Sequence, residues 1–176
     1  MCERTSGLLR REGIVNYSDG NAPTRRRDDV IGQVPGIDPG ARFESRRHLL
    51  HSGVHRDLMK GIAGNQEDGA ESILLNGGYE DDADIGDTVV YTGHGGRDDK
   101  TGKQTSDQKL ERGNLALARS FYGGRPIRVV RGPSQPGPHA PKAGFRYDGL
   151  FHVQHMWQQR GRSGFWVWRY LLVKID

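Results

Sequence analysis

Glycine is the feature that most constrains how this chain can fold. The 176 residues include 26 glycines and 8 prolines, and the glycine share is about twice the usual value of roughly 7%. Glycine weakens the interior of helices and strands but is favoured in turns and bulges. We therefore expect one domain built from short elements that tight turns connect, with strands predominating over helices.

Five short segments predict strands. Each is rich in β-branched or aromatic residues and is flanked by glycine, proline or aspartate, and together they cover residues 72–75, 88–92, 127–131, 150–156 and 165–173. One helix is predicted at 106–121, because residues 105–108 match a capping box and Gly123 with Gly124 can end it. The Pro- and Gly-rich residues 132–144 predict a surface loop. These elements favour a sheet or a small barrel.

The chain divides near residue 30. Residues 1–29 hold scattered apolar positions and end in a basic run, which is typical of an arm. Such an arm can be flexible, can pair with another subunit to form a homo-oligomer, or can contact phosphate, and the sequence leaves these alternatives open. From Ile31 the chain carries Pro and Gly turns and then punctuated apolar runs, so we expect the compact domain to span residues 30–176.

Arginine dominates the charge of the chain. There are 26 basic and 22 acidic residues, for a net charge of +4, and 20 of the basic residues are arginine. Five of the acidic residues fall within Glu80–Asp87, so the rest of the chain is more basic than the total suggests. A basic surface attracts a phosphate backbone, and the planar guanidinium suits bidentate phosphate contacts. Nucleic acid is the first partner to consider, and a merely solvated basic surface is the alternative.

The sequence lacks the residues that several classes of function need. Cys2 is the only cysteine, which excludes an internal disulfide framework and a cysteine-based zinc site. No window approaches eighteen apolar residues and the first residues lack an apolar signal core, so we expect an intracellular protein without a membrane span.

Catalytic and metal motifs are missing as well. The chain has no His-Glu-x-x-His motif, nucleophile elbow or P-loop. The acidic stretch Glu80–Asp87 lacks the spacing of an EF-hand loop and is interpreted as a solvated turn. We therefore expect a binding protein rather than an enzyme, with no catalytic residue, no metal and no cofactor.

Ten short phrases carry the strongest signal, because they keep a fixed order and approximate spacing. They are GxVPGIxxG at 32–40, SGVHR at 52–56, GIAG at 61–64, GGYEDD at 77–82, YTGHGGRD at 91–98, DQKL at 107–110, NLAL at 114–117, PIRVVR at 126–131, RYDGLF at 146–151 and SGFWVWRYLL at 163–172. Together they closely resemble the SRA domain, also called the YDG domain, of methylated-DNA-binding proteins. The resemblance implies an α+β fold, in which a strongly twisted, crescent-shaped β-barrel of the SRA/PUA-like kind has a few flanking helices. It also implies binding of double-stranded DNA, with 5-methylcytosine rotated out of the stack into a pocket.

The resemblance assigns the walls of this pocket. Tyr79 and Tyr91 match the two aromatic residues that sandwich the flipped base, and Asp82 matches the acid that accepts a hydrogen bond from the cytosine amino group. An ionised carboxylate can only accept, so it suits the N4 amino group of cytosine and disfavours the O4 of thymine. Without the motif, both tyrosines would be interpreted as ordinary strand residues.

Further positions of the pocket follow from the same resemblance. Asn76, Gly77, Gly78 and Thr92 match places whose backbone groups complete the contacts to the base edge. His94 stands where other members often have a small residue near the base methyl, which leaves the tolerance of hydroxymethylcytosine open. One buried methyl group contributes only about 0.8 kcal/mol, so we expect a preference for the methylated base rather than absolute selection.

Contacts to the DNA backbone and grooves are assigned in the same way. Met59 is the candidate for a side chain that fills the gap left by the flipped base, with Lys60 second, because an apolar wedge can enter between base steps. A buried methionine is the alternative. Arg56 and Arg97 match positions near the phosphates, whereas other arginines are interpreted as general surface charge. These are Arg112, Arg128 and Arg131.

Residues 99–106 form a segment shorter than the loop with which eukaryotic readers of hemimethylated CpG enter the major groove. Lys100, Lys103 and Gln104 can still reach a groove from this segment. We therefore expect little requirement for a CpG context or for hemimethylation.

The sequence is compatible with three functions. The first is a stand-alone reader of DNA that contains a modified cytosine, the second is the DNA-recognition part of a modification-dependent restriction system, and the third is a general nucleic-acid-binding or protein-interaction module. The 176 residues show no nuclease motif outside the resemblance, which favours the first.

Overall fold

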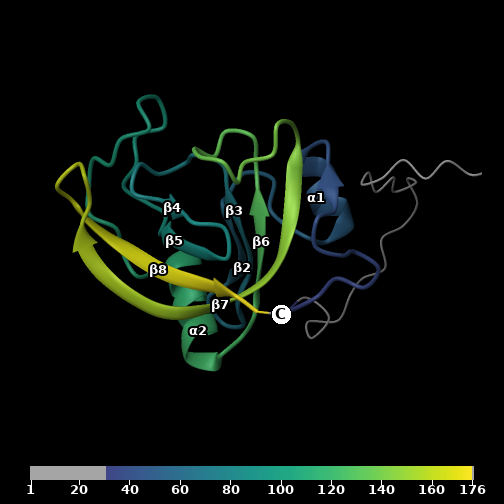
Figure 1. The fold of residues 1–176 in the computed structure, drawn as a ribbon. Coiled ribbons are helices and arrows are strands. Elements are labelled where there is room, and N and C mark those ends of the chain that lie inside the picture. The colour runs from purple at the N-terminus through teal and green to yellow at the C-terminus, as the bar shows by residue number, and fades with distance from the viewer. Residues whose placement is uncertain (1–30, 176) are drawn as a thin grey trace, which may run out of the picture.

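The computed structural model describes residues 31–175, whose arrangement is shown in Figure 1. The strands are β1 (Arg42–Phe43), β2 (Ile62–Asn65), β3 (Gly69–Leu75), β4 (Ala83–Asp84), β5 (Thr88–Thr92), β6 (Ile127–Arg131), β7 (Phe145–Arg160) and β8 (Trp166–Lys174), and the helices are α1 (Arg46–Ser52) and α2 (Gly113–Gly123). The five strands predicted from the sequence correspond to β3, β5, β6, β7 and β8. The arm expected at residues 1–29, with its alternatives, lies outside the described residues.

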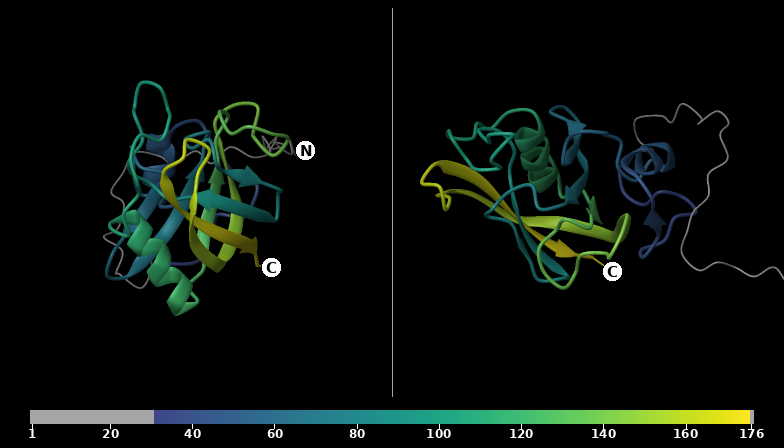
Figure 2. Two further views of the ribbon diagram at one scale, coloured as in Figure 1. Left: turned by 90° about the vertical axis from the view of Figure 1, so that its left-hand side faces the viewer. Right: turned by 90° about the horizontal axis from the view of Figure 1, so that it is seen from above.

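The strands form one mixed sheet in the order β2-β3-β6-β7-β8-β5-β4, and β1 pairs with the beginning of β7. β3 and β6 are parallel, whereas the other pairs are antiparallel. The edge strands β2 and β4 do not pair with each other within residues 31–175, so the sheet is open and curved (Figure 2). The predicted strongly twisted, crescent-shaped sheet with a few flanking helices is thereby confirmed.

The central strands β3 and β6 are buried on both faces. Ile73 of β3 points into a core that includes Leu117 of α2, while the next residue, Leu74, points into a second core with Leu49 of α1. All the residues of β3 and β6 are buried, as is typical of a parallel pair that is covered on two sides. The two cores fix the sheet between α2 and the segment that contains α1.

β7 is the longest strand and joins the two halves of the sheet. Its 16 residues span on the order of 50 Å at the usual rise per residue. The strand first pairs with β1 and β6 and then with β8, and its register with β8 shifts between Val153 and His155. Figures 1 and 2 show the resulting β7–β8 hairpin sweeping along one side of the molecule.

The predicted start of the long helix is wrong. α2 begins at Gly113 rather than at residue 106, and the helix has no side-chain cap. Instead, the Asp107 carboxylate accepts the Trp166 amide at 2.8 Å, and Gln108 Oε1 accepts the Trp168 amide at 2.9 Å. Residues 107–108 thus pair with the free edge of β8, and this tertiary pairing outweighs the local capping signal. The predicted end is confirmed, since Gly124 closes α2 in a left-handed conformation.

The interpretation of Arg131 and Arg128 as surface charge is also wrong, because both are buried. Arg131 Nε and Nη2 donate to the two Asp84 carboxylate oxygens at 2.8 and 2.7 Å, and Nη1 donates to Asp148 at 2.8 Å. Arg128 donates to the carbonyl oxygens of Val54 and Gly32 at 2.9 and 2.7 Å. A buried charge needs such partners, so these arginines fasten the β4–β5 turn and the segment before β1 to the sheet.

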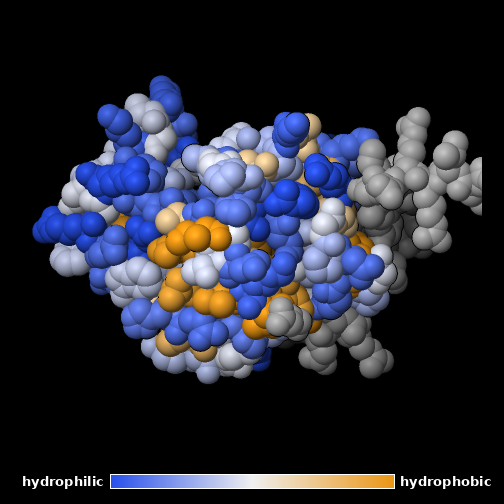
Figure 3. Space-filling view, in the orientation of Figure 1, coloured by the Kyte–Doolittle hydropathy of each residue, from blue (hydrophilic) through white to orange (hydrophobic). Residues whose placement is uncertain are grey.

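The side of the molecule that is shown in Figure 3 is mainly polar. Figure 3 shows hydrophilic residues over most of this side of the molecule, with hydrophobic residues gathered over β4, β5 and β8. Ile85, in the turn between β4 and β5, is 71% exposed. Within residues 31–175, no helix has the length and apolar character needed to cross a membrane.

The Arg131 network gives a test of the fold. We expect Arg131→Met to lower the free energy of unfolding by about 3–5 kcal/mol, since Asp84 and Asp148 lose the cation that compensates them. Urea denaturation of the wild type and the variant at pH 7 measures the difference. Arg119→Met, at an exposed position of α2, is the matched control and should change stability by about 0.5 kcal/mol or less. Equal effects of the two substitutions would contradict the structural role of Arg131.

Candidate nucleic-acid interface

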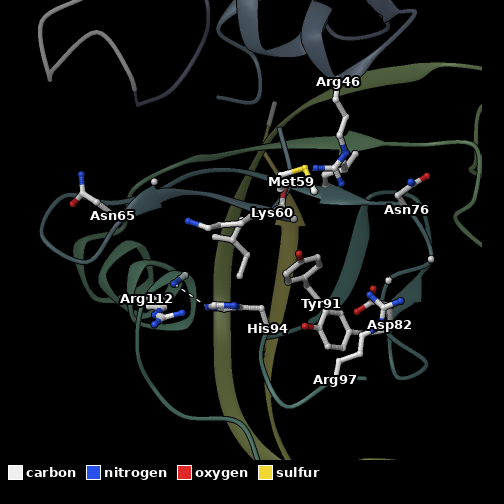
Figure 4. Close-up of a pocket in the computed structure, with 18 of the residues that line it drawn as sticks. Arg46, Met59, Lys60, Asn65, Asn76, Asp82, Tyr91, His94, Arg97 and Arg112 are labelled. Atoms are coloured by element: carbon white, nitrogen blue, oxygen red, sulfur yellow. Dashed lines mark hydrogen bonds between the residues drawn. The ribbon is translucent and has the colours of Figure 1, made fainter. Parts of the chain in front are cut away.

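A cavity of about 540 Å³ opens on the side of the sheet that carries the sequence-predicted residues. Its size is within the range of about 300–1,000 Å³ that is common for ligand sites. The lining comes from five parts of the chain, which are Arg46 of α1, residues 59–66, residues 74–82, residues 91–97 and the start of α2 at residues 112–113. Figure 4 shows Tyr91, Asp82 and Arg97 together on one side of the cavity and His94 with Arg112 on the other.

Tyr79 and Tyr91, which the sequence resemblance assigns to the walls of a base pocket, both line the cavity. The Tyr79 hydroxyl accepts the Gly95 amide at 3.0 Å, which ties the turn after β3 to the segment after β5. Tyr91 is only 3% exposed, and burial raises the pKa of its phenol well above the usual value. Gly61 lies so close that a Cβ atom there would come within 2.7 Å of Tyr91 Oη. Glycine at position 61 therefore allows the ring its place in the wall.

Among residues 31–175, Asp82 is the one acidic residue that lines the cavity. Its Oδ1 accepts the backbone amide of Thr92 at 2.7 Å. Burial raises the pKa of the Asp82 carboxyl to about 6, although the hydrogen bonds from Thr92 and the charge of Arg169 act in the opposite direction. The carboxyl is therefore mainly ionised at neutral pH but close to its titration range.

Thr92, which the sequence placed in the pocket, lies behind the wall. It is 1% exposed and is not part of the lining, and its amide is used to orient Asp82. Asn76, Gly77 and Gly78 do line the cavity. Asn76 Oδ1 accepts the Ser134 amide at 3.0 Å, and the Gly77 amide donates to Gln135 Oε1 at 3.1 Å. The loop at residues 132–144 thus holds this turn in place.

His94 connects the cavity to α2. The Gly113 amide donates to His94 Nε2 at 3.2 Å, and the His94 amide donates to Asn114 Oδ1 at 2.8 Å. Burial lowers the pKa of the imidazole, so the ring is neutral near pH 7. A Cβ on Gly113 would meet Ile62 and His94 at 3.1–3.2 Å. Because Gly113 has no side chain, the start of α2 can pack closely against this wall.

Met59 and Lys60 lie at the mouth of the cavity (Figure 4). Met59 is 85% exposed, which excludes the alternative of a buried methionine. The turn that carries it is braced, because Asp57 Oδ1 accepts the amides of Met59 and Lys60 at 2.8 and 2.7 Å. Arg46 Nη1 also donates to the carbonyl oxygens of Leu58 and Lys60, both at 3.1 Å.

Arg97 begins the short loop that follows β5. Its guanidinium lies over the Tyr79 ring, 5.6 Å from the centroid, and its Nε donates to the Gly102 carbonyl at 3.2 Å. Lys100 and Lys103 are exposed in this loop. The prediction that Gln104 can reach a groove is wrong, because Gln104 is buried and donates to the carbonyl oxygens of Gly95 and Ser106 at 2.7 and 2.8 Å.

Arg56 does not line the cavity. Its Nε and Nη2 donate to the two Glu71 carboxylate oxygens at 2.8 and 2.7 Å, so its cation is already neutralised within the fold. Two cations of the lining were missed by the sequence interpretation. They are Arg46 and Arg112, the second of which was interpreted as general surface charge. No local motif marks them, since only the tertiary fold brings α1 and the start of α2 to the cavity.

The arrangement is suited to binding a ring next to phosphates. Two phenol rings and one carboxylate line the recess, and four cations, Arg46, Lys60, Arg97 and Arg112, line it as well. Aromatic faces stack on bases, and guanidinium and ammonium groups attract a phosphate backbone. The fold and the site thus define a class of protein, one with an open, curved sheet and a recess that carries aromatic rings, a carboxylate and cations.

Comparison with known proteins identifies the family. Residues 30–176 match the model of the SAD/SRA domain, and the chain belongs to this family. The chain is 43% identical over 167 residues to E3 ubiquitin-protein ligase UHRF1 of Rattus norvegicus. The aligned region covers 83% of this chain and 21% of that protein. It therefore spans about a fifth of the length of this curated relative.

Two solved structures are similar throughout the domain. One is the modification-dependent TagI restriction endonuclease, with a TM-score of 0.79 and 44% identity over 82% of this chain and 52% of that chain. The other is the complex of the SUVH5 SRA domain with hemi-methylated CG DNA, with a TM-score of 0.69 and 37% identity over 83% of this chain and 94% of that chain. The fold expected from the sequence resemblance is therefore confirmed at the level of the whole domain.

The raised pKa of Asp82 makes a prediction about stability. A carboxyl whose pKa rises on folding stabilises the fold below its unfolded pKa, and this contribution is lost as the pH rises through about 6. Asp82→Asn keeps an acceptor for the Thr92 amide but carries no charge. At pH 7 we expect the variant to be more stable than the wild type by about 1–3 kcal/mol, and the difference should vanish near pH 4.

Urea denaturation between pH 4 and pH 8 checks this prediction. Asp87→Asn is the matched control, because the Asp87 side chain is 83% exposed and should show no such pH-dependent gain. A destabilised Asp82→Asn variant at pH 7 would show that the buried carboxylate costs the fold nothing.

Proposed function

We propose that this domain binds double-stranded DNA and holds a 5-methylcytosine, flipped out of the helix, between Tyr79 and Tyr91. The observation that carries the proposal is the placement of both rings and the Asp82 carboxylate in one recessed cavity with four cations. The SUVH5 SRA domain, which shares the fold, is described in complex with hemi-methylated CG DNA. A partner of this kind also implies that the domain acts inside the cell, at DNA.

The free-energy cost of flipping the base and the gain from stacking it between the rings are of similar size. Base flipping costs a few kcal/mol, and base-aromatic stacking contributes about 1–3 kcal/mol per base. Contacts of Arg46, Lys60 and Arg112 to phosphates would add affinity for any DNA. Met59, exposed at the mouth of the cavity, is the side chain that would fill the space left in the duplex.

Selectivity for the base would come from Asp82. Its Oδ1 is used by the Thr92 amide, and the remaining acceptor capacity of the carboxylate suits the N4 amino group of cytosine. Selectivity for the methyl group must be weaker, because one methyl in a fitted pocket is worth about 1–3 kcal/mol. The short loop at residues 97–104 supports recognition with little dependence on CpG context or hemimethylation.

Removal of one ring tests the proposal. We expect Tyr79→Ala to weaken binding to a duplex with a single 5-methylcytosine by about 5- to 150-fold, the equivalent of 1–3 kcal/mol of stacking. Binding to the unmodified duplex should change little, because phosphate contacts remain. Fluorescence polarisation with both duplexes at one salt concentration measures the effect.

Tyr122→Ala is the matched control for this experiment, since Tyr122 is 80% exposed on α2 and does not line the cavity. The control should bind both duplexes as the wild type does. If Tyr79→Ala weakened the two duplexes equally, the aromatic recess would not be the site of the modified base.

A second candidate function is recognition of DNA for a modification-dependent restriction system. The similarity to the TagI restriction endonuclease favours it. We expect the domain alone to leave a methylated plasmid intact after incubation with Mg²⁺ or Mn²⁺, because residues 31–175 contain no group of three or more His, Cys, Asp or Glu side chains that could hold a metal ion. Gel electrophoresis of the plasmid checks this, with an unmethylated plasmid as the control. Cleavage that depends on methylation would assign the enzymatic function to this chain.

A further inference from the structure

Arg169 on β8 is a buried cation next to the cavity but outside its lining. The residue is 6% exposed. In the sheet it stands opposite Thr92 of β5 on one side and opposite Trp157 of β7 on the other. Residues that face each other across antiparallel strands share one face of the sheet, so Arg169 shares a face with the residue whose amide holds Asp82.

The surroundings of Arg169 contain two carboxylates. Its charge interacts with Asp81 and Asp82 in the turn between β3 and β4, whereas Arg162 repels it. Asp81 is itself fixed over the β7–β8 turn, because its Oδ1 accepts the Arg162 amide at 3.0 Å. The Nε of Arg169 is buried and has no hydrogen-bond partner within residues 31–175. The fold therefore keeps a desolvated cation here, and the charges of the two acids offset its desolvation only in part.

We propose that Arg169 is a positioning residue, which keeps Asp82 ionised when the domain meets a base and thereby maintains discrimination of cytosine from thymine. The inference rests on the proposed function of the cavity and names the group behind the wall that sets its selectivity.

The charge state of Asp82 decides which base edge it can pair with. An ionised carboxylate accepts a hydrogen bond from the cytosine amino group, but a protonated carboxyl also donates and can pair with the O4 of thymine. Burial favours the protonated form of Asp82 and raises the pKa to about 6, whereas the charge of Arg169 favours the ionised form. Without Arg169 the pKa of the carboxyl would rise further, and the site would lose part of its ability to reject thymine.

Other groups that face Asp82 do not replace this cation. Asp81, on the same turn, raises the pKa of Asp82. The phenols of Tyr79 and Tyr91 lie close enough for their own pKa values to respond to Asp82, but both are neutral at pH 7. The Thr92 amide donates one hydrogen bond and carries no charge. Arg97 lies on the same side of the cavity (Figure 4), but its guanidinium is placed over the Tyr79 ring and its Nε donates to the Gly102 carbonyl. The cation that lowers the pKa of Asp82 is Arg169 of β8.

The experiment compares two bases in one duplex as the pH changes. Each duplex carries either 5-methylcytosine or thymine opposite an abasic site, so that neither base has a partner to lose. Affinities are measured by fluorescence polarisation from pH 5 to pH 8.5 at constant ionic strength. The readout is the ratio of the two affinities, in which the general effect of pH on phosphate contacts cancels. For the wild type we expect this ratio to fall below about pH 6, where Asp82 becomes protonated.

Three variants test the role of Arg169. In Arg169→Met the midpoint of the ratio should move to higher pH, and a shift of one unit would lower the ratio at pH 6.5 by about threefold. Arg169→Lys should restore the midpoint toward the wild type, because the cation is kept. Asp81→Asn should move the midpoint to lower pH, since it removes the acid that opposes ionisation of Asp82. Opposite shifts of this kind do not follow from a merely structural role.

The outcomes separate this inference from the proposed function. An unchanged midpoint in Arg169→Met together with an unchanged midpoint in Asp81→Asn would overturn the role of Arg169 while the cavity could still bind the base. If Arg169→Met fails to fold, ¹³C NMR titration of the Asp82 carboxyl in Asp81→Asn and Arg169→Lys decides between the same two results. A wild-type ratio of one at all pH values would instead overturn base recognition by the cavity. A ratio that rises as the pH falls would show that Asp82 acts in its protonated form and would also overturn the inference.

Discussion

The antiparallel pairing of β5 with β8 is the interaction on which the cavity depends. It sets Tyr91 opposite Tyr170, whose ring is buried in the core, and Thr92 opposite Arg169 on the other face. Because side chains alternate along a strand, the Tyr91 side chain lies on one face and forms a wall of the recess, whereas the Thr92 side chain lies on the other face. The backbone amide of Thr92 orients Asp82. A slip of one residue in this register would turn the Tyr91 side chain away from the recess.

The strands were predictable where local and tertiary preferences agree. β5 and β6 begin and end where the sequence places them, because their β-branched residues are bounded by Asp, Pro and Gly. The start of α2 was not predictable, since Asp107 and Gln108 satisfy the edge of β8 instead of a helix end. The short strands β1, β2 and β4 and the seven-residue α1 carry too few residues for a periodic signal.

The residues of the candidate site were likewise predictable from the sequence only in part. Motif matching singled out Tyr79, Asp82 and Tyr91, which come from two neighbouring segments and line one cavity. It could not reveal Arg46 and Arg112, because nothing in their local sequence indicates that α1 and the start of α2 approach the recess. Nor could it show that Arg56 is occupied by Glu71, since the pairing of charges depends on which acid the fold brings near.

The bracing of the turn at residues 57–60 affects how the domain meets a partner. Asp57 and Arg46 fix the backbone from within the protein, so the main chain there has little conformational entropy left to lose on association. An apolar side chain, Met59, is therefore presented in advance on a rigid support rather than folded into place by the ligand. The speed of complex formation would then be governed by spontaneous opening of the partner rather than by rearrangement of this domain.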